Sequence, residues 1–403
     1  MEHFITKYDV NCPAGTMSAA LEDSIMHKGR PVTAGSKILE NFVSPLDATV
    51  VTKLEAAGIT ILGKTKMDEF GASGLFGNVE PGAPDSEFRS GAVSAVAEGD
   101  ATFALCNDYT GAVSQEAAAH NLCYIHPTYG SVSRYGLIHA VPSMDQIGIV
   151  CKTPADGLYA LSVISGHDPK DGAMFSGSGK WKVESGKLTM SSGRVRVGVP
   201  VNVLAWVSDA SAVLEFAKGF DTVDFDLGYF DVYAQVMQIL CSAELSNNTT
   251  RYDGIKFGYR AEGYRNLHEL YTKSRTEAFG ADVKLASIIG SMVLSQENYL
   301  RYYDKAMRIR RLIKESLEFD KYDVIIMPTA KQGDAKQGDG SSAWLHQADE
   351  PSPCLAASLC FSALPRLCGL PAVTVPFKGG GITLIGDSNC ENVLFSALEA
   401  VGL

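Results

Sequence analysis

The sequence predicts an α/β fold, in which a large central sheet is covered by helices on both faces. Segments with apolar residues at helical spacing alternate along the chain with short, continuously apolar runs. Such runs are typical of strands that are buried on both faces. A glycine often separates the helical segment from the run, which is the usual place for a helix C-terminal cap. Together these observations favour a layered α/β unit.

The alternation is clearest in the first half of the chain. Val50–Ala57 has apolar residues at helical spacing, Gly58 follows as a stop signal, and Ile59–Lys64 then predicts a short buried strand. The same order predicts three further pairs of a helix and a strand: Val93–Ala97 before Thr102–Cys106, Pro154–Ser165 before Val195–Pro200, and Ala210–Lys218 before Thr222–Phe225.

The second half continues the pattern with longer elements. Met292–Phe319, rich in charge and tyrosine, predicts a long helical region, and Tyr322–Thr329 predicts a strand. Gly369–Pro376 and Gly381–Gly386 predict two late strands, and Val393–Val401 predicts a closing helix. The sequence contains no internal repeat and no linker of domain-boundary character. We therefore predict that residues 1–403 form a single domain.

Composition limits the classes of function. The chain has 403 residues and a net charge of −11, and it contains no dense run of lysine and arginine, which argues against direct nucleic-acid binding by this chain alone. We find no signal peptide and no apolar run near the ~18 residues of a membrane span. Nine cysteines without a Cys-x-x-Cys pair indicate reduced thiols and a cytoplasmic location. We expect neither a metal nor a cofactor.

One stretch carries a specific motif. It reads Pro-Thr-Tyr-Gly-Ser-Val-Ser-Arg-Tyr-Gly-Leu over Pro127–Leu137 and continues as Ser-Met-Asp-Gln-Ile-Gly over Ser143–Gly148. This stretch resembles the amidase signature family, and within it most of all the A subunits of the glutamyl-tRNA(Gln)/aspartyl-tRNA(Asn) amidotransferase. Gly63–Phe70, Ile326–Ala330 and Cys368–Ala372 extend the resemblance over nearly the whole chain. It implies the amidase-signature fold, with a large, mixed and mostly parallel central sheet flanked by helices on both faces.

The resemblance also identifies a changed catalytic frame. The family sequence reads Asp-Thr-Gly-Gly-Ser-Ile-Arg-Gln-Pro-Ala-Ala, and its serine attacks the amide. Over Asp108–Ala118 this chain reads Asp-Tyr-Thr-Gly-Ala-Val-Ser-Gln-Glu-Ala-Ala, which places Ala112 at the nucleophile. A methyl group cannot attack a carbonyl. The other relay members, a lysine and a serine with a cis peptide bond, match Glu22 and Phe88. We expect a trans peptide bond at 87–88 or 88–89, because the serine is absent.

The positions that recognise substrate in the family differ as well. A family arginine matches Ala286 and a family aspartate matches Leu359, so the two charges that would hold glutamine are lost. A remnant pocket is implied by residues that persist from the family frame or line its site region: Asp108, Gly111, Ser114, Gln115, Tyr129, Ser131 and Arg134. We interpret Asp108 and Gln115 as hydrogen-bond partners that brace the loop.

The leading hypothesis is a catalytically inactive amidase-like paralogue that serves as a binding or scaffold subunit, with amidotransferase B-like and C-like subunits as candidate partners. The resemblance also implies a shortened N-terminal region. An alternative is an amide-bond hydrolase or glutaminase whose site is rebuilt around Ser90, Ser94 or Ser114. A further alternative is a small-molecule sensor that uses the remnant pocket. The family activity itself would be amidase or glutamine-dependent amidotransferase.

Overall fold

The computed structural model describes residues 3–13, 15–76, 90–174, 183–184, 187–188, 195–207, 209–256, 258–329 and 357–403. Its main feature is an 11-stranded sheet in the order β1-β3-β2-β4-β6-β5-β12-β13-β11-β9-β10. The strands of this sheet are β1 (Phe4–Lys7), β2 (Ser18–Glu22), β3 (Thr60–Thr65), β4 (Phe103–Asn107), β5 (Cys123–His126), β6 (Ile147–Cys151), β9 (Arg196–Pro200), β10 (Asp221–Phe225), β11 (Val324–Thr329), β12 (Ala372–Phe377) and β13 (Gly380–Gly386). A separate pair joins β7 (Val183–Glu184) and β8 (Lys187–Leu188).

The sheet is mixed, as the resemblance implied, but the expectation of a mostly parallel sheet is wrong, because its centre is antiparallel. Parallel pairs join β2 to β3 and β4 at one side, and β9 to β10 and β11 at the other. From β4 to β11 the neighbouring strands run antiparallel. One cause is the two-residue connection Lys378-Gly379 between β12 and β13, whose φ angles are 46° and 79°. Such a tight turn can only reverse the chain, whereas a parallel pair needs a crossover.

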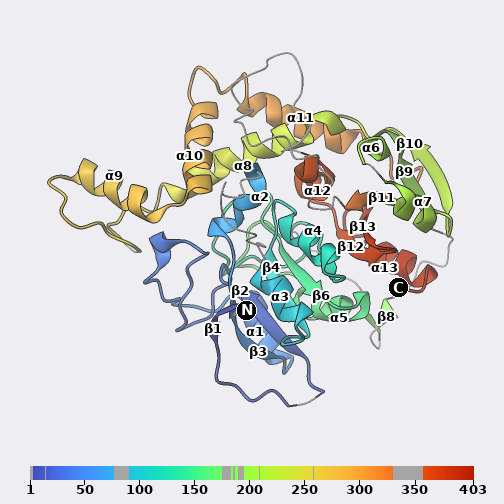
Figure 1. Ribbon diagram of the computed structural model, residues 1–403, viewed down its shortest axis with the longest axis horizontal. Coiled ribbons are helices and arrows are strands. Elements are labelled where there is room, and N and C mark those ends of the chain that lie inside the picture. The colour runs from blue at the N-terminus through green and yellow to red at the C-terminus, as the bar shows by residue number, and fades with distance from the viewer. Residues whose placement is uncertain are drawn as a thin grey trace.

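Helices cover both faces of the sheet (Figure 1). They are α1 (Thr49–Ala56), α2 (Ser73–Phe76), α3 (Gly91–Ala97), α4 (Ala112–Ala119), α5 (Pro154–Ile164), α6 (Val201–Leu204), α7 (Ser211–Ala217), α8 (Tyr233–Thr249), α9 (Leu267–Ala278), α10 (Ala281–Val293), α11 (Tyr303–Glu315), α12 (Ala357–Cys368) and α13 (Glu391–Ala400). Helices α1, α5, α7 and α13 share one apolar core with the sheet. Helices α3 and α4, and the group α8, α10, α11 and α12, belong to two other cores.

Strand β4 illustrates burial on both faces. Its residues are all buried, and successive side chains enter different cores: Phe103 and Leu105 pack with α1 and α5, whereas Ala104 and Cys106 pack with α3 and α4. Successive residues of a strand point to opposite faces, so both faces of β4 must be apolar. This explains why the strand appears in the sequence as a continuous apolar run.

The predicted helix over Met292–Phe319 is wrong at its start. Helix α10 already ends at Val293, turns follow over 294–302, and α11 begins at Tyr303. The Ser295 hydroxyl donates to the Met292 carbonyl oxygen at 2.8 Å and accepts from the Asn298 amide at 3.1 Å. Local bonds of this kind compete with helical ones and favour turns. The other predicted elements agree with the structure to within a few residues, among them α1, α5 and α13.

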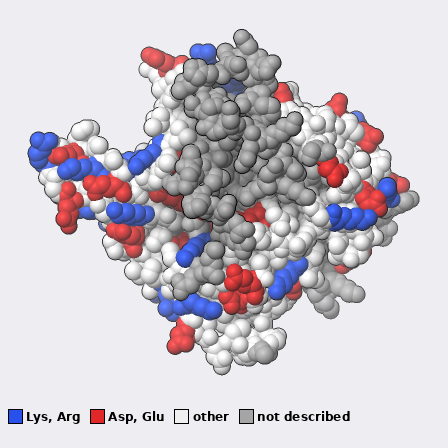
Figure 2. Space-filling view, in the orientation of Figure 1, with Lys and Arg blue, Asp and Glu red and all other residues white. Residues whose placement is uncertain are grey.

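Charge is interleaved on the face drawn in Figure 2. Lysine and arginine lie beside aspartate and glutamate along the arm that contains α9, and the described residues of this face form no continuous basic stripe. Across the described ranges, no helix combines the length and the apolar character that a bilayer span requires. Among the described residues, all the cysteines are free thiols.

Candidate functional site

The frame expected to hold the nucleophile forms the turn between β4 and α4. Gly111 precedes the helix with φ 90°, and Ala112 is its first residue. A Cβ atom on Gly111 would lie 2.1 Å from the Cβ atom of Ser362, so only glycine fits between the turn and α12. The turn therefore presents the Ala112 methyl group at the start of α4.

The Asp108 carboxylate braces this turn, as predicted. Its Oδ1 accepts hydrogen bonds from the backbone N–H groups of Gly111 at 2.8 Å and Val113 at 3.2 Å. Its Oδ2 accepts the N–H group of Ser114 at 2.9 Å. A carboxylate in this place satisfies unpaired donors of the first helical turn and complements the helix dipole. Asp108 thus holds the backbone of the turn.

Arg366 of α12 is the main feature that sequence reasoning missed. Its Nη2 lies 2.7 Å from Asp108 Oδ2 and 3.0 Å from the Ser114 oxygen, and its Nε donates to the Asp108 carbonyl oxygen at 2.8 Å. The guanidinium is buried, with an exposed side-chain fraction of 3%. The sequence comparison with the family frame did not reveal this contact, because Arg366 lies far from the frame along the chain.

Further contacts close α12 over the turn. The Ser362 hydroxyl donates to the Thr110 carbonyl oxygen at 2.7 Å, and the Gln115 amide donates to the Ser358 carbonyl oxygen at 2.7 Å. The Ser114 hydroxyl donates to the Gly111 carbonyl oxygen at 2.9 Å. The space left beside these residues is a cavity of about 10 Å³, bordered by Ser114, Gln115, Thr329, Phe361, Ser362, Arg366 and Thr383. A single water needs roughly 10–15 Å³ by this measure.

Glu22, which matches the family lysine, lies at the end of β2 and is buried. Its Oε2 accepts the Asn107 N–H group at 2.5 Å and the Ser24 hydroxyl at 3.3 Å, which ties it to the turn before Ala112. Burial, together with the charges of Asp68 and Asp108, raises the pKa of Glu22 to about 8 against the lowering effect of these hydrogen bonds. The sequence argument assumed an ordinary carboxylate, and burial is what changes its acidity.

Lys64 is a second buried charge near Glu22 that sequence reasoning did not single out. Its ammonium donates to the carbonyl oxygens of Glu22, at 2.9 Å, and of Ile25, and it lies 4.0 Å from Asp23 Oδ1. Burial lowers the pKa of Lys64 to about 8, against the raising effect of Asp23 and Glu22. Because its protons are directed at main-chain oxygens, Lys64 holds the end of β2 in place.

The serines proposed for a rebuilt site are separated by their environments. Ser90 precedes α3, and its N–H group donates to both carboxylate oxygens of Glu116, at 2.8 and 2.9 Å. Ser94 is buried within α3. Ser114 is held by Arg366, a cation and not a base. Phe88, and with it the expected trans peptide bond, lies outside the described residues.

The remaining pocket residues belong to the loop after β5. Arg134 forms a fork with the Asp171 carboxylate, with contacts of 3.1 and 3.2 Å, and its centre lies 4.8 Å from the Tyr129 ring. Burial alone would raise the pKa of Asp171, but the hydrogen bonds from Arg134 and Ala173 outweigh it and lower that pKa. Ser131 is buried, and its hydroxyl has no hydrogen-bond partner among the described residues. These contacts hold the loop.

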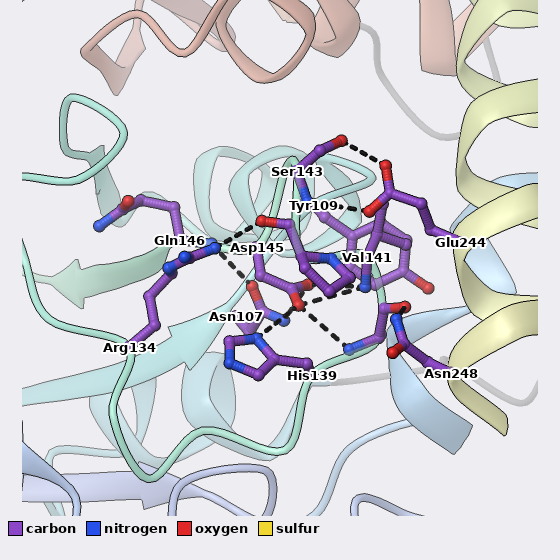
Figure 3. Close-up of polar contacts among 12 residues, drawn as sticks. Asn107, Tyr109, Arg134, His139, Val141, Ser143, Asp145, Gln146, Glu244 and Asn248 are labelled. Atoms are coloured by element: carbon purple, nitrogen blue, oxygen red, sulfur yellow. Dashed lines mark hydrogen bonds and ion pairs between the residues drawn. The ribbon is translucent and has the colours of Figure 1, made fainter. Parts of the chain in front are cut away.

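A polar network around Asp145 joins this loop to β4 (Figure 3). The Asn107 amide donates to Asp145 Oδ1 at 2.9 Å, and a ring nitrogen of His139 lies 3.1 Å from Oδ2. The Gln146 N–H group donates to the Asn107 side-chain oxygen at 3.1 Å. Asn107 also contacts Glu22, so one connected set of bonds spans the scaffold of the site. Satisfied buried networks of this kind favour a single arrangement.

Ala286 and Leu359 lie in the same apolar core. Ala286 is completely buried in α10, and Leu359 is buried in α12. Neither position offers a charge, and the surrounding aliphatic and aromatic side chains would not stabilise one. Within the described ranges, no group of three histidine, cysteine or acidic residues is arranged to bind a metal ion.

Comparisons with known proteins agree with this fold. The family model described as Amidase matches residues 14–392. The chain therefore belongs to the amidase family. It is 36% identical over 387 residues to the A subunit of the glutamyl-tRNA(Gln) amidotransferase from Lachnoclostridium phytofermentans, a match that covers 90% of this chain and 76% of that relative. The protein of the same name from Acinetobacter baumannii is 34% identical over 409 residues, covering 94% and 80%.

A solved structure supports the same assignment of fold. The A subunit of the glutamyl-tRNA(Gln) amidotransferase from Thermotoga maritima matches with a TM-score of 0.70 and 25% sequence identity, covering 99% of this chain and 86% of that chain. The recognition of an amidase-signature protein from Pro127–Gly148 is thus confirmed, as is the large mixed sheet flanked by helices.

Proposed function

We propose that this chain is a catalytically inactive member of the amidase family that serves as a binding or scaffold subunit. The observation that carries the proposal is Ala112, in a turn that Arg366 braces. A methyl group stands where the family frame has its attacking serine, and the buried Arg366 guanidinium is bonded to Asp108 and Ser114 of the same turn. Covalent catalysis requires an activated nucleophile, which this arrangement does not supply.

The state of Glu22 supports the same conclusion. In the family relay a lysine accepts the proton of the serine pair. Glu22 has a pKa of about 8 and is hydrogen-bonded to the Asn107 N–H group and the Ser24 hydroxyl. At neutral pH it therefore carries its own proton for most of the time and is a poor acceptor of another. Two of the three relay positions thus lack the chemistry of the family.

The intact scaffold favours retention of a binding role. The bonds around Asp145, the Arg134–Asp171 fork and the close packing of α12 are extensive. Relatives that cover most of this chain are named glutamyl-tRNA(Gln) amidotransferase A subunits. We infer that the partner is of the B-subunit or C-subunit type and that the complex is cytoplasmic.

The geometry argues against the two alternatives. A rebuilt hydrolase would need a base beside Ser114, but that hydroxyl contacts the Gly111 carbonyl oxygen and the Arg366 cation. A sensor that used the space beside Ser114 would need room for a ligand, and the cavity there is about 10 Å³. Neither observation favours a second function at this site.

Activity is tested by measuring ammonia release from glutamine, asparagine and acetamide with the purified chain, coupled to glutamate dehydrogenase. We expect the purified chain to release ammonia no faster than buffer alone. A rate that persists through purification and vanishes in Ser114→Ala or Ser90→Ala would replace the proposal with the rebuilt-site hydrolase. Ser316→Ala, remote from α4 in the sequence, serves as the matched control.

The binding role is tested by co-expression with the B-type and C-type subunits encoded in the same genome. Size-exclusion chromatography with light scattering should give a complex of defined stoichiometry. A chain that stays free of both subunits under these conditions would contradict the role proposed for it, even if it releases no ammonia.

A further inference from the structure

A second and much larger hollow lies on the other side of the end of α12. Its volume is about 520 Å³. Helix α11 forms one wall. The rest of the lining comes from 128–129 after β5, Ser143 before β6, 367–369 at the end of α12, and 388–389 before α13. We call this hollow the α11 groove. None of its described lining residues borders the cavity beside Ser114.

The wall from α11 is cationic. Met307, Arg310, Arg311 and Lys314 follow the spacing i, i+3, i+4, i+7, which places them on one side of the helix. Three of the four carry positive charge, and no aspartate or glutamate occurs among the described residues that line the groove. In a chain with a net charge of −11, such a local excess of cations is the reverse of the average surface. It favours an anion.

Arg310 is held in position for such a contact. Its Nε donates to the Leu367 carbonyl oxygen at 2.6 Å, and its Nη1 and Nη2 donate to the hydroxyl and carbonyl oxygens of Ser143 at 2.9 and 3.0 Å. Arginine has five N–H donors. These three bonds fix the plane of the guanidinium and leave two donors for a ligand. A fixed donor loses less entropy on binding.

Lys314 supplies a charge that is not neutralised by a neighbour. It is exposed, and no described side chain forms an ion pair or hydrogen bond with it. Arg311 differs, because its Nε lies 2.6 Å from Glu315, which is outside the lining. Among the described residues, the groove therefore contains one free cation, one cation with two spare donors, and one cation that is already paired.

The lining also contains apolar groups. Leu367, Cys368 and the Tyr129 ring face the groove from the other segments, and Met307 adds an apolar side chain from α11. Burial raises the pKa of the Cys368 thiol to about 12, so this side chain stays neutral. An apolar surface with a few placed polar groups, and a volume within the roughly 300–1,000 Å³ typical of ligand sites, suits a small molecule.

We propose that the α11 groove binds a small organic anion, in which a carboxylate or phosphate group is joined to an apolar or aromatic body. The anionic group contacts Lys314 and the spare donors of Arg310. The apolar body packs against Leu367, Met307 and the Tyr129 ring. This site is independent of the inactive frame at Ala112, so it stands whether or not that frame releases ammonia.

Calorimetric titration of the full chain at constant ionic strength tests this assignment. The probes are phenyl phosphate and benzoate, with inorganic phosphate and benzyl alcohol as the isolated halves. We expect saturable 1:1 binding of at least one aromatic anion, and binding at least about tenfold weaker for both halves. A tenfold change corresponds to about 1.4 kcal/mol, within the range of one charge-assisted hydrogen bond.

Matched variants locate the site. Lys314→Gln should weaken the aromatic anion by about tenfold. Lys305→Gln removes the same charge from an exposed position of α11 outside the lining and should change nothing. Met307→Asp places a carboxylate in the groove and should abolish binding. Its side chain is 41% exposed, so the fold should tolerate it. Melting temperatures confirm that each variant is folded.

Four results would overturn the proposal. Two concern the probes: neither aromatic anion binds saturably, or inorganic phosphate binds as strongly as phenyl phosphate. Two concern the variants: Lys314→Gln and Lys305→Gln lose equal affinity, or a folded Met307→Asp variant binds as the parent does. Tighter, Lys314-dependent binding of a short polyglutamate peptide would instead indicate an acidic segment of a partner protein.

Discussion

Two spaces border helix α12, and they contrast in both size and charge. The cavity beside Ser114 measures about 10 Å³, and its cation Arg366 is matched by the Asp108 carboxylate. The α11 groove measures about 520 Å³, and its cation Lys314 has no such partner among the described residues. Helix α12 thus packs tightly over the turn that holds Asp108 and Ser114, and it also borders an open, cationic hollow.

The difference also concerns stability. A buried ion pair that is cut in half leaves an uncompensated charge, whereas an exposed one exchanges its partner for water. The sealed site should therefore be sensitive to substitution, and the groove tolerant of it. The following changes break or sharpen that contrast, beginning with the largest expected effect.

Arg366→Ala should lower the free energy of unfolding by about 3–5 kcal/mol, because it leaves Asp108 buried without its cation. Urea denaturation at neutral pH measures this. Arg311→Ala is the control from the groove. Its ion pair with Glu315 is exposed on both sides, and its loss should change the free energy of unfolding far less, because solvent screens an exposed pair. Similar values for the two variants would show that Arg366 is not the element that seals the frame.

Glu22→Gln should change how stability depends on pH. The pKa of Glu22 is raised from 4.5 to about 8, so the folded state binds this proton more tightly than the unfolded state. Its contribution is complete below about pH 4.5 and is lost as the pH rises to about 8, with a slope approaching about 1.4 kcal/mol per pH unit.

The variant removes this titration. Relative to the parent chain, its free energy of unfolding should gain at least about 2 kcal/mol between pH 5 and pH 8. Denaturation at several pH values provides the comparison. Glu399→Gln, at an exposed position of α13, is the control for the substitution itself. A parallel curve for Glu22→Gln would mean that its carboxyl group titrates normally.

Gly111→Ala tests how tightly α12 covers the turn. A left-handed backbone alone costs other residues roughly 1–2 kcal/mol, and here the new Cβ would also overlap the Cβ atom of Ser362 at 2.1 Å. Gly379→Ala separates these effects, because its φ is 79° and no atom lies within 4 Å of the added Cβ. In thermal unfolding, the melting temperature of Gly111→Ala should be well below that of Gly379→Ala. Equal decreases in melting temperature would mean that α12 moves away from the added Cβ atom at little cost.

Restoring the three relay side chains should have the smallest effect, which is no change in the rate of ammonia release. Glu22→Lys, Phe88→Ser and Ala112→Ser together recreate the three family side chains. Ammonia release from glutamine should still equal the buffer rate, because Ala286 and Leu359 offer no charge to the substrate. Measurable release would mean that the frame is still able to bind substrate.

The sequence alone predicted the α/β class and most of the helices and strands, because these depend on local patterns of apolar residues. The apolar runs at β3 and β4 appear in the printed sequence, as do the helices α1 and α13. The motif over Pro127–Gly148 lies within the segment that the family model matches, and both assign the same fold. The break between α10 and α11 was not predicted. It is stabilised by side-chain hydrogen bonds of Ser295, and the spacing of apolar residues does not reveal such bonds.

The sequence by itself determined that a methyl group stands at position 112, since the chemistry of a side chain is fixed by its identity. Tertiary structure decided what surrounds that methyl group. Arg366 reaches Asp108 across 258 positions of the chain, and its approach depends on how α12 packs against α4. The raised pKa of Glu22 and the open groove beside Lys314 depend likewise on burial and exposure. These properties arise only when distant segments are brought together, because solvation and distance, not residue order, set electrostatic energies.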